Sequence, residues 1–311
     1  MSERARMVDG FLRELGWAKA HMTPIAGDMS SRRYARLRRN DESAVLMDAD
    51  TDQTAFMQMT VWLGEAGLSV PRIIGADAEA GLILLEDLGR MSLKGLLESD
   101  SALEKPLFRD CIELLLHVRK QAAPPLHCPT ASELVEWTTL ADEHYPGIES
   151  TRLAAFRTIL QDALEEALSF KASVSLRDFH AENIMWLPER RGIRRMGLLD
   201  YQDAFLTHPV YDLVSLLTDA RRFVSAELRE EMIGSYVAHS GDEAMPFNRA
   251  FAAFSAQRNL RILGIFARAG RHLSLLPNVY RYFSEALDHE MFSHVRNEVL
   301  NSVPSPGDIS S

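Results

Sequence analysis

The sequence has 311 residues, of which 46% are hydrophobic and 25% are charged, a balance typical of a soluble globular protein with one large domain or two lobes. Its formal charge of −10 argues against broad nucleic-acid binding, because that function needs a basic surface. The two cysteines, Cys111 and Cys128, match no metal or redox spacing and indicate a reducing compartment.

The first ninety residues predict a small antiparallel sheet that carries a helix. Residues 2–16 place apolar side chains on one helical face, and residues 33–39 alternate as a strand does. Short apolar runs at 43–47 and 81–89 predict two further strands, and a helix is expected between them at 54–67. No segment is long and apolar enough for a membrane helix, so we expect a cytoplasmic protein with no membrane partner.

From about residue 100 the hydrophobic pattern becomes helical. Periodic apolar residues predict helices at 210–223, 226–239, 247–270 and 278–300, after two short polar-ended segments within 173–205. The fold class predicted is therefore α+β. We expect an N-terminal nucleotide-binding lobe at 1–88, a helical catalytic and substrate lobe at 89–301, and a flexible tail at 302–311.

The two interrupting segments contain the candidate catalytic and metal-binding residues. Asp178 precedes Asn183 by five positions, and Asp200 ends a later apolar run. Phosphoryl transfer needs a carboxylate that orients and deprotonates the acceptor hydroxyl, together with oxygen ligands for magnesium. This pattern predicts Asp178 as the base and Asn183 and Asp200 as ligands of Mg²⁺. A lone Asp178 could instead cap a helix or a turn.

Three motifs in this order resemble the aminoglycoside phosphotransferase and choline kinase group: LRDFHAEN at 176–183, LDYQDA at 199–204 and HPVYDLVSLL at 208–217. Together with AGDMSSRRYARL at 26–37 and LLEDLG at 84–89, they are similar to the bacterial anomeric kinases of N-acetylmuramate and N-acetylglucosamine. The resemblance implies a bilobal protein-kinase-like fold, with a small β-rich N-lobe and a large helical C-lobe. It also implies an ATP- and Mg²⁺-dependent kinase of an amino sugar, active in cell-wall recycling.

Two positions depart from the pattern of this group. Leu176 replaces the first histidine of the loop, where the side chain mainly packs. The third strand offers Met47 and Asp48 in place of the expected lysine, so the phosphate charge must be met elsewhere. Arg32 and Arg33 are the nearest candidates, because guanidinium groups bind phosphate in bidentate fashion.

The resemblance implies further roles for residues outside the base and metal positions. His180 follows the base and either approaches the transferred phosphate or is an ordinary loop histidine. Asp212 is expected to hold the catalytic loop through its backbone. The remaining expectations concern nucleotide and substrate: Ser30, Ser31, Arg32 and Arg33 at phosphate, the backbone at Glu86 and Leu88 at adenine, and Asp203, Gln257, Arg258 and Arg261 at the sugar.

Three functions compete for this sequence. The resemblance favours the amino sugar kinase. Arg258, Arg261 and Arg268 lie close to one helical face and either receive a carboxylate of the sugar or are solvated or paired with surface acids. Phosphorylation of an aminoglycoside or another small alcohol is a second candidate, although a polycation would need clustered acids. The missing lysine and Leu176 favour a third, a nucleotide-binding pseudokinase. The pattern predicts neither the choice between ATP and GTP nor the oligomeric state.

Overall fold

The structure is a computed structural model that describes residues 2–25 and 32–309. It divides into two compact units: unit 1 comprises Met1–Leu93 with Ile184–Asp203, and unit 2 comprises Lys94–Asn183 with Ala204–Ser311. The segment 184–203 was expected in the second lobe but packs with unit 1. The reason is a set of backbone hydrogen bonds within that unit, from Trp186 N to Met91 O at 2.8 Å and from Leu198 N to Ser69 O at 2.8 Å.

Unit 1 is built on a five-stranded antiparallel sheet in the order β1-β2-β3-β5-β4. The sequence predicted the three inner strands and missed the two edge strands, one of which contains Pro24. Proline is tolerated at a sheet edge, so it hides such a strand from pattern analysis. The elements of unit 1 are α1 (Glu3–Glu14), β1 (His21–Ile25), β2 (Arg33–Arg39), β3 (Glu42–Asp48), α2 (Thr54–Glu65), β4 (Ile73–Asp77), β5 (Leu82–Glu86), β7 (Ile184–Trp186) and β8 (Met196–Leu198).

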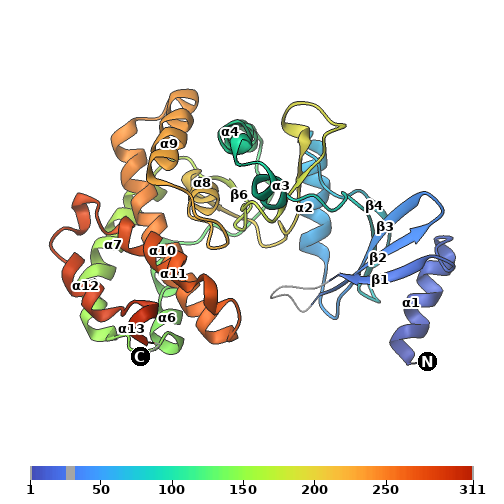
Figure 1. Ribbon diagram of the computed structural model, residues 1–311, viewed down its shortest axis with the longest axis horizontal. Coiled ribbons are helices and arrows are strands. Elements are labelled where there is room, and N and C mark those ends of the chain that lie inside the picture. The colour runs from blue at the N-terminus through green and yellow to red at the C-terminus, as the bar shows by residue number, and fades with distance from the viewer. Residues whose placement is uncertain (1, 26–31, 310–311) are drawn as a thin grey trace. The chain divides into compact units, whose positions relative to one another are not determined.

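Both faces of this sheet are covered, with α1 and α2 on opposite sides (Figure 1). Phe11 and Leu12 of α1 join a buried cluster with Leu82 and Leu84 of β5. Successive strand residues point to opposite faces, so Ile83, which is also buried, faces the side of α2. This explains why β5 is a continuous apolar run rather than an alternating one.

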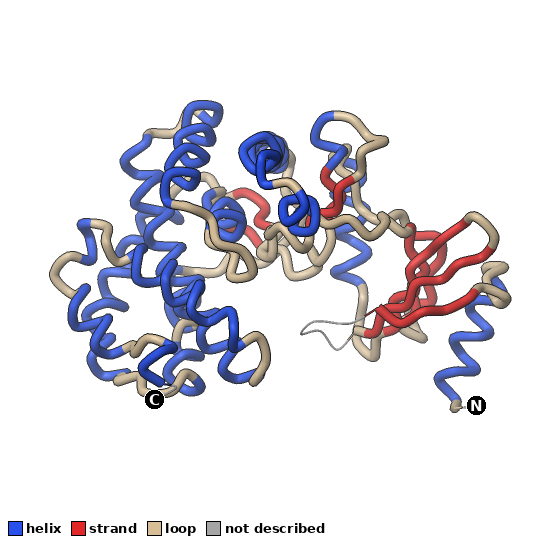
Figure 2. Tube along the Cα trace, viewed as in Figure 1, coloured by secondary structure: helices blue, strands red, loops and turns tan. Residues whose placement is uncertain are grey.

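Unit 2 is mainly helical (Figure 2) and is organised around one long central helix, α10. Its remaining elements are α4 (Glu104–Lys120), α5 (Ala131–Glu136), α6 (Thr139–His144), α7 (Ala154–Leu168), β6 (Ser173–Ser175), β9 (Phe205–Thr207), α8 (Val210–Leu217), α9 (Ala226–Ser240), α10 (Ala244–Ala269), α11 (Leu276–Ala286), α12 (Arg296–Ser302) and α13 (Pro306–Ile309), while α3 (Leu93–Ser99) spans the boundary between the units. Among the described residues, no helix is long and apolar enough to span a membrane.

Two predictions for the C-terminal region are wrong. The single helix expected at 278–300 is divided into α11 and α12, because the intervening segment turns inward and buries Phe292 completely. The flexible tail expected from residue 302 is packed over its described part. Val303 is fully buried, Tyr145 donates a hydrogen bond from its hydroxyl to Pro304 O at 2.9 Å, and a short helix follows.

Candidate active site

The loop that follows β6 is held at its start by a buried carboxylate. Asp212, in the first turn of α8, accepts hydrogen bonds from Ser175 Oγ at 2.8 Å, Leu176 N at 2.6 Å and Arg177 N at 2.9 Å. Burial raises the pKa of Asp212 to about 6, and these donors offset that cost because they stabilise the charged form. The predicted structural role of Asp212 is confirmed.

Asp178 lies directly after this anchored segment, with its side chain 40% exposed. The Asn183 side chain folds back and donates from Nδ2 to Asp178 O at 3.0 Å, which closes the loop between the two residues. Since the amide nitrogen is the donor here, the amide oxygen is the atom suited to a cation. The separation of five residues between the acid and the amide therefore corresponds to a compact loop.

His180 is buried inside the same loop, 5% exposed. Its Nε2 lies 3.3 Å from Asn183 Nδ2 and 3.4 Å from Arg221 Nη1. Burial, followed by the nearby charges of Arg221, Arg258 and Lys94, lowers the pKa of His180 well below its ordinary value. The ring is therefore neutral at pH 7, accepts at Nε2, and carries its proton on Nδ1, which has no partner among the described residues.

Arg221 is a site residue that the sequence reasoning missed. It forms an ion pair from Nε to Glu182 Oε2 at 2.6 Å, and its backbone N donates to Asp219 Oδ1 at 2.9 Å. Glu182 is part of the catalytic loop, so Arg221 supports that loop from the segment after α8. The only sequence signal was a pair of arginines following an acid in TDARR at 218–222.

The arginines predicted on one helical face have different environments. Arg258 is buried, donates from Nη2 to Ser215 Oγ at 2.8 Å, and lies 3.9 Å from Asp178 Oδ1. Arg261 is partly buried, with its guanidinium 4.8 Å from the centre of the Trp137 ring. Arg268 is exposed.

Gln257 is fully buried and donates from Nε2 to Leu134 O at 2.8 Å. Its side chain joins α10 to α5, which accounts for its burial without a substrate, and the contact with a sugar hydroxyl stays a prediction. An amide at this helical position satisfies a carbonyl of the neighbouring helix, which sequence spacing does not distinguish from substrate binding.

In unit 1, Asp200 and Asp203 follow β8 and are both exposed. Gln202 lies between them and donates from Nε2 to Asp200 Oδ1 at 2.8 Å and to Asp203 Oδ2 at 3.3 Å. Tyr201 fixes this segment, because its ring stacks on Phe56 of α2 with centroids 5.4 Å apart. An aromatic side chain thus positions the predicted metal ligand.

The backbone at these two loops is strained. Arg177 has a φ of 70° and Asp200 a φ of 59°, and they are two of only four described non-glycine residues in the left-handed region. This conformation costs about 1–3 kcal/mol for such a residue and persists only where surrounding contacts enforce it. The strain is therefore concentrated beside the predicted base and at the predicted metal ligand.

Arg32 and Arg33 have different partners in unit 1. Arg33 donates to Asp48 Oδ1 at 3.1 Å and to Asp50 Oδ1 at 3.4 Å, and the hydrogen bond with Asp48 raises its pKa. Arg33 is thus engaged by acids of unit 1, and its contact with phosphate stays a prediction. Arg32 donates from Nε to Gln53 Oε1 at 2.9 Å. It lies close to Tyr34, whose pKa burial raises to about 12, with Asp200 also near that ring.

Three further nucleotide-binding predictions fall in unit 1. Ser30 and Ser31 lie outside the described residues. The Glu86 carboxylate accepts from Arg190 Nη2 at 2.8 Å and from Arg72 N at 3.2 Å, so the side chain is engaged in structure, as expected if only the backbone meets adenine. Leu88 is buried in a small apolar cluster with Met185 and Leu187, packed against Leu199.

The donor set fits magnesium. Asp200 supplies a carboxylate and Asn183 an amide oxygen, both of the hard type that Mg²⁺ prefers. The structure contains no cluster of three or more His, Cys, Asp or Glu residues suited to a metal over 2–25 and 32–309. Magnesium keeps several waters and takes ligands from substrate phosphates, so its binding does not require such a cluster, and the assignment of Asn183 and Asp200 as its ligands stays a prediction. Asn183 belongs to unit 2 and Asp200 to unit 1.

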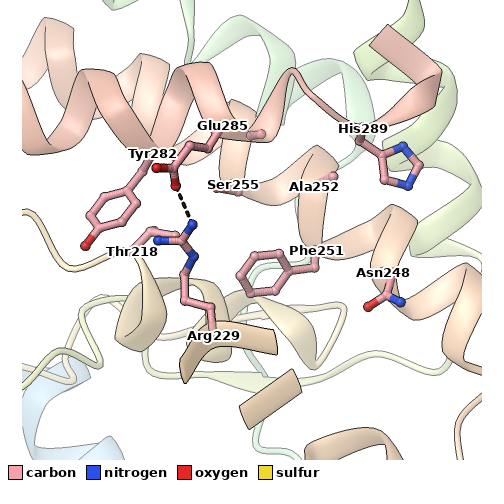
Figure 3. A pocket seen from close by; sticks show the side chains of 10 residues that line it. Thr218, Arg229, Asn248, Phe251, Ala252, Ser255, Tyr282, Glu285 and His289 are labelled. Carbon is pink, nitrogen blue, oxygen red and sulfur yellow. Dashed lines mark hydrogen bonds and ion pairs between the residues drawn. The ribbon is translucent and has the colours of Figure 1, made fainter. Parts of the chain in front are cut away.

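Unit 2 also holds a cavity of about 250 Å³ among α9, α10 and α11 (Figure 3). Phe251 and Tyr282 supply aromatic walls, and Arg229 forms an ion pair with Glu285 at its side. None of the residues predicted for the site lines this cavity. The ion pair neutralises its strongest charges, so the cavity adds nothing to the candidate site.

Comparison with known proteins identifies the family. The model of the phosphotransferase enzyme family matches residues 21–254. Two relatives are named N-acetylmuramate/N-acetylglucosamine kinase: one from Caulobacter vibrioides is 31% identical, with 90% of this chain and 92% of that protein covered, and one from Pseudomonas aeruginosa is 30% identical, with 98% of each covered.

The solved structures agree at the level of fold. Choline kinase LicA from Streptococcus pneumoniae superposes with a TM-score of 0.68 at 14% identity, covering 94% of this chain and all of that one, and it has also been solved with AMP. The fold is thus that of the protein-kinase-like phosphotransferases, as predicted. The chain belongs to the phosphotransferase enzyme family, and it is a nucleotide-dependent kinase.

Proposed function

We propose that this protein transfers the γ-phosphoryl group of ATP to the anomeric hydroxyl of an amino sugar, N-acetylmuramate or N-acetylglucosamine. The observation that carries the proposal is the catalytic loop: a half-exposed Asp178 held by the Asn183 amide and by the buried Asp212. The names of the relatives, at about 30% identity over nearly the whole chain, support the choice of acceptor.

Asp178 acts as the general base in this proposal. Its carboxylate accepts the proton of the acceptor hydroxyl while the acceptor oxygen bonds to the γ-phosphorus. The bond from that phosphorus to the bridging oxygen breaks, and ADP leaves with the electron pair. Arg258, 3.9 Å away, stabilises the ionised carboxylate before the transfer. A positioned base of this kind contributes roughly 10²–10⁴-fold.

The other loop residues orient groups rather than exchange protons. His180 is neutral and keeps a buried Nδ1–H without a described partner, so we assign it as a hydrogen-bond donor toward the transferred phosphate. Asn183 and Asp200 would hold Mg²⁺, which when bound neutralises charge on the phosphates. Arg32 replaces the missing strand lysine as the phosphate-binding cation of unit 1. In unit 1, the backbone at Glu86 and Leu88 would receive adenine, and Asp203 would orient the sugar.

The charges beside Asp178 disfavour an aminoglycoside acceptor. Arg177 precedes the base, Arg258 lies 3.9 Å from its carboxylate, and Arg261 is nearby. A polycationic acceptor would be repelled by these guanidinium groups, whereas a neutral or anionic sugar would not. The pseudokinase alternative is disfavoured because base, amide and second acid are all retained.

A phosphorylation screen tests the proposal. The purified chain is incubated with ATP, Mg²⁺ and, in turn, N-acetylmuramate, N-acetylglucosamine, kanamycin and choline, and the site of phosphorylation is located by NMR. The proposal requires a phosphate on the anomeric carbon of at least one amino sugar. Turnover restricted to kanamycin or choline, or none with any acceptor, would refute it.

A further inference from the structure

A pair of arginines in unit 2 lies around one tryptophan without neutralising acids. The guanidinium carbon of Arg261 is 4.8 Å from the Trp137 ring centre, and that of Arg177 is 5.9 Å away. Neither guanidinium forms a hydrogen bond or an ion pair within the described part of the chain. By contrast, Arg119, Arg157 and Arg222 in the same unit all pair with carboxylates.

Trp137 holds these cations but leaves their charge uncompensated. The face of an indole ring attracts a guanidinium through its quadrupole, yet it supplies no formal negative charge. The ring itself is fixed edge-on against Phe205, with centroids 5.9 Å apart. Burial, with Arg177 and Arg258 nearby, lowers the pKa of Arg261, and Asp178, which acts in the opposite direction, forms no ion pair with it. An anionic ligand would supply the negative charge that compensates the two guanidinium groups.

The backbone of Arg177 is fixed in a strained conformation. Its N–H is bound by Asp212 and by Ser175 Oγ at 3.1 Å, and its carbonyl accepts from Ser215 Oγ at 3.2 Å. Arg258 in turn donates to Ser215 Oγ. Arg258 is thus a positioning residue for the Arg177–Asp178 segment, and the two arginines around Trp137 are the ones left for a ligand.

We infer that Arg177 and Arg261, held by Trp137, form an acceptor subsite for a carboxylate carried on the sugar, the lactyl group of N-acetylmuramate. The inference rests on the proposed function and deepens it. Arg177 adjoins the base, and Arg261 lies three residues beyond Arg258 on α10, near enough to Asp178 for the two charges to interact. N-acetylmuramate carries its lactyl ether on the same ring as the anomeric hydroxyl, and planar guanidinium groups bind carboxylates in bidentate fashion.

Kinetics with three acceptors test the subsite: N-acetylmuramate, its methyl ester, which has the same shape without the charge, and N-acetylglucosamine. In the parent enzyme, kcat/KM for N-acetylmuramate should exceed that for the ester by about tenfold or more. Arg261→Gln and Arg177→Gln should each remove most of this ratio, because they slow the acid far more than the ester. Trp137→Leu should reduce the ratio as well, because the cations lose their support.

Arg249→Gln is the matched control, since Arg249 lies on the same helix and pairs with Glu166 at the surface. It should leave the ratio unchanged. A parent enzyme that does not discriminate the acid from its ester overturns the inference, as do variants that slow all three acceptors equally, the result expected if the arginines bind the transferred phosphate.

A binding measurement separates the subsite from the proposed function. If no sugar is phosphorylated, the proposed function fails, and calorimetry with N-acetylmuramate and its ester decides the subsite alone. Binding of the acid that exceeds binding of the ester, and that Arg261→Gln weakens by about tenfold, supports it. Equal binding of acid and ester, or no binding of either, overturns it.

Discussion

The two loops with predicted catalytic carboxylates are positioned by different physical means. Asp178 in unit 2 belongs to a loop fixed by polar contacts, chiefly three hydrogen bonds to the buried Asp212. Asp200 in unit 1 is followed by Tyr201, whose fully buried ring stacks on Phe56. One carboxylate is thus located by directional hydrogen bonds, and the other by the packing of its neighbour.

This difference matches the role proposed for each carboxylate. A base has to meet one proton at hydrogen-bond distance, so its backbone needs directional restraint. A magnesium ligand binds an ion that also accepts several waters, which tolerates more freedom in the ligand. We therefore expect damage to the polar anchor to lower turnover most, and damage to the aromatic anchor to lower stability most.

Of the substitutions that damage either anchor, Asp212→Ala is expected to lower turnover most, because it removes the acceptor of three donors. Each unsatisfied buried donor costs about 1–3 kcal/mol, and a small displacement of the base lowers turnover by roughly 10²-fold. Steady-state kinetics and denaturant unfolding of the same variant measure both. Near-normal kcat in a destabilised variant would show that the loop does not depend on this anchor.

Tyr201→Ala should destabilise the protein by about 3–5 kcal/mol, as expected for a buried aromatic side chain. Tyr201→Phe keeps the stacking. It loses only the hydroxyl, which donates to Thr60 Oγ1 at 2.8 Å because Thr60 uses its own proton on Phe56 O. That loss should cost about 1 kcal/mol. Urea unfolding of both variants measures these losses. Equal destabilisation of the two variants would contradict the view that ring stacking is the main contribution of Tyr201.

The helix that carries Asp212, α8, also predicts a pH dependence of the free energy of unfolding. At its start, His208 Nδ1 accepts a hydrogen bond from Val210 N at 3.1 Å. Burial lowers the pKa of His208 from 6.5 to about 4. Between these values the unfolded state binds more protons, so this stabilisation is complete above pH 6.5 and is lost as the pH falls toward 4.

The expected contribution of His208 is up to about 3 kcal/mol. Because the raised pKa of Asp212 acts in the opposite direction over the same range, the parent should be compared with His208→Asn, which keeps an acceptor but does not titrate. The difference between their free energies of unfolding should shift by that amount from pH 7 to pH 4. If the free energies of unfolding of the parent and His208→Asn changed in parallel with pH, a stabilising role of neutral His208 would be excluded.

Arg32 and Arg33 give a matched pair within unit 1. Arg32→Gln should raise the KM for ATP by roughly 10- to 100-fold, the loss expected for a charge-assisted contact to phosphate. Arg33→Gln should change it little, because Arg33 is engaged by Asp48 and Asp50. Equal effects on KM from the two substitutions would count against Arg32 as the replacement for the strand lysine.

Much of this site was predictable because its chemistry lies in short contiguous motifs. Asp178 and Asn183 share one loop, and the spacing alone indicated a base and an amide ligand. Asp212 could be assigned as a support because a buried acid at a helix start must find donors. The inner strands and long helices followed from their hydrophobic periods.

The sequence could not predict features that depend on the direction of a side chain. Arg32 and Arg33 are neighbours in sequence, yet Arg32 donates to Gln53 whereas Arg33 pairs with Asp48 and Asp50. Gln257 and Arg261 lie one turn apart on α10, and only packing against α5 distinguishes a buried amide from a candidate ligand. Trp137 and Arg177 are remote in sequence, so no local pattern indicated that they meet.

The most direct test of the central claim is Asp178→Asn, which keeps the shape of the side chain and removes its basicity. Single-turnover phosphorylation of N-acetylmuramate, measured beside the equilibrium binding of ATP, separates chemistry from nucleotide affinity. The account predicts a rate lower by roughly 10²–10⁴-fold with ATP binding unchanged. A rate within a few-fold of the parent enzyme would contradict the assignment of Asp178 as the base.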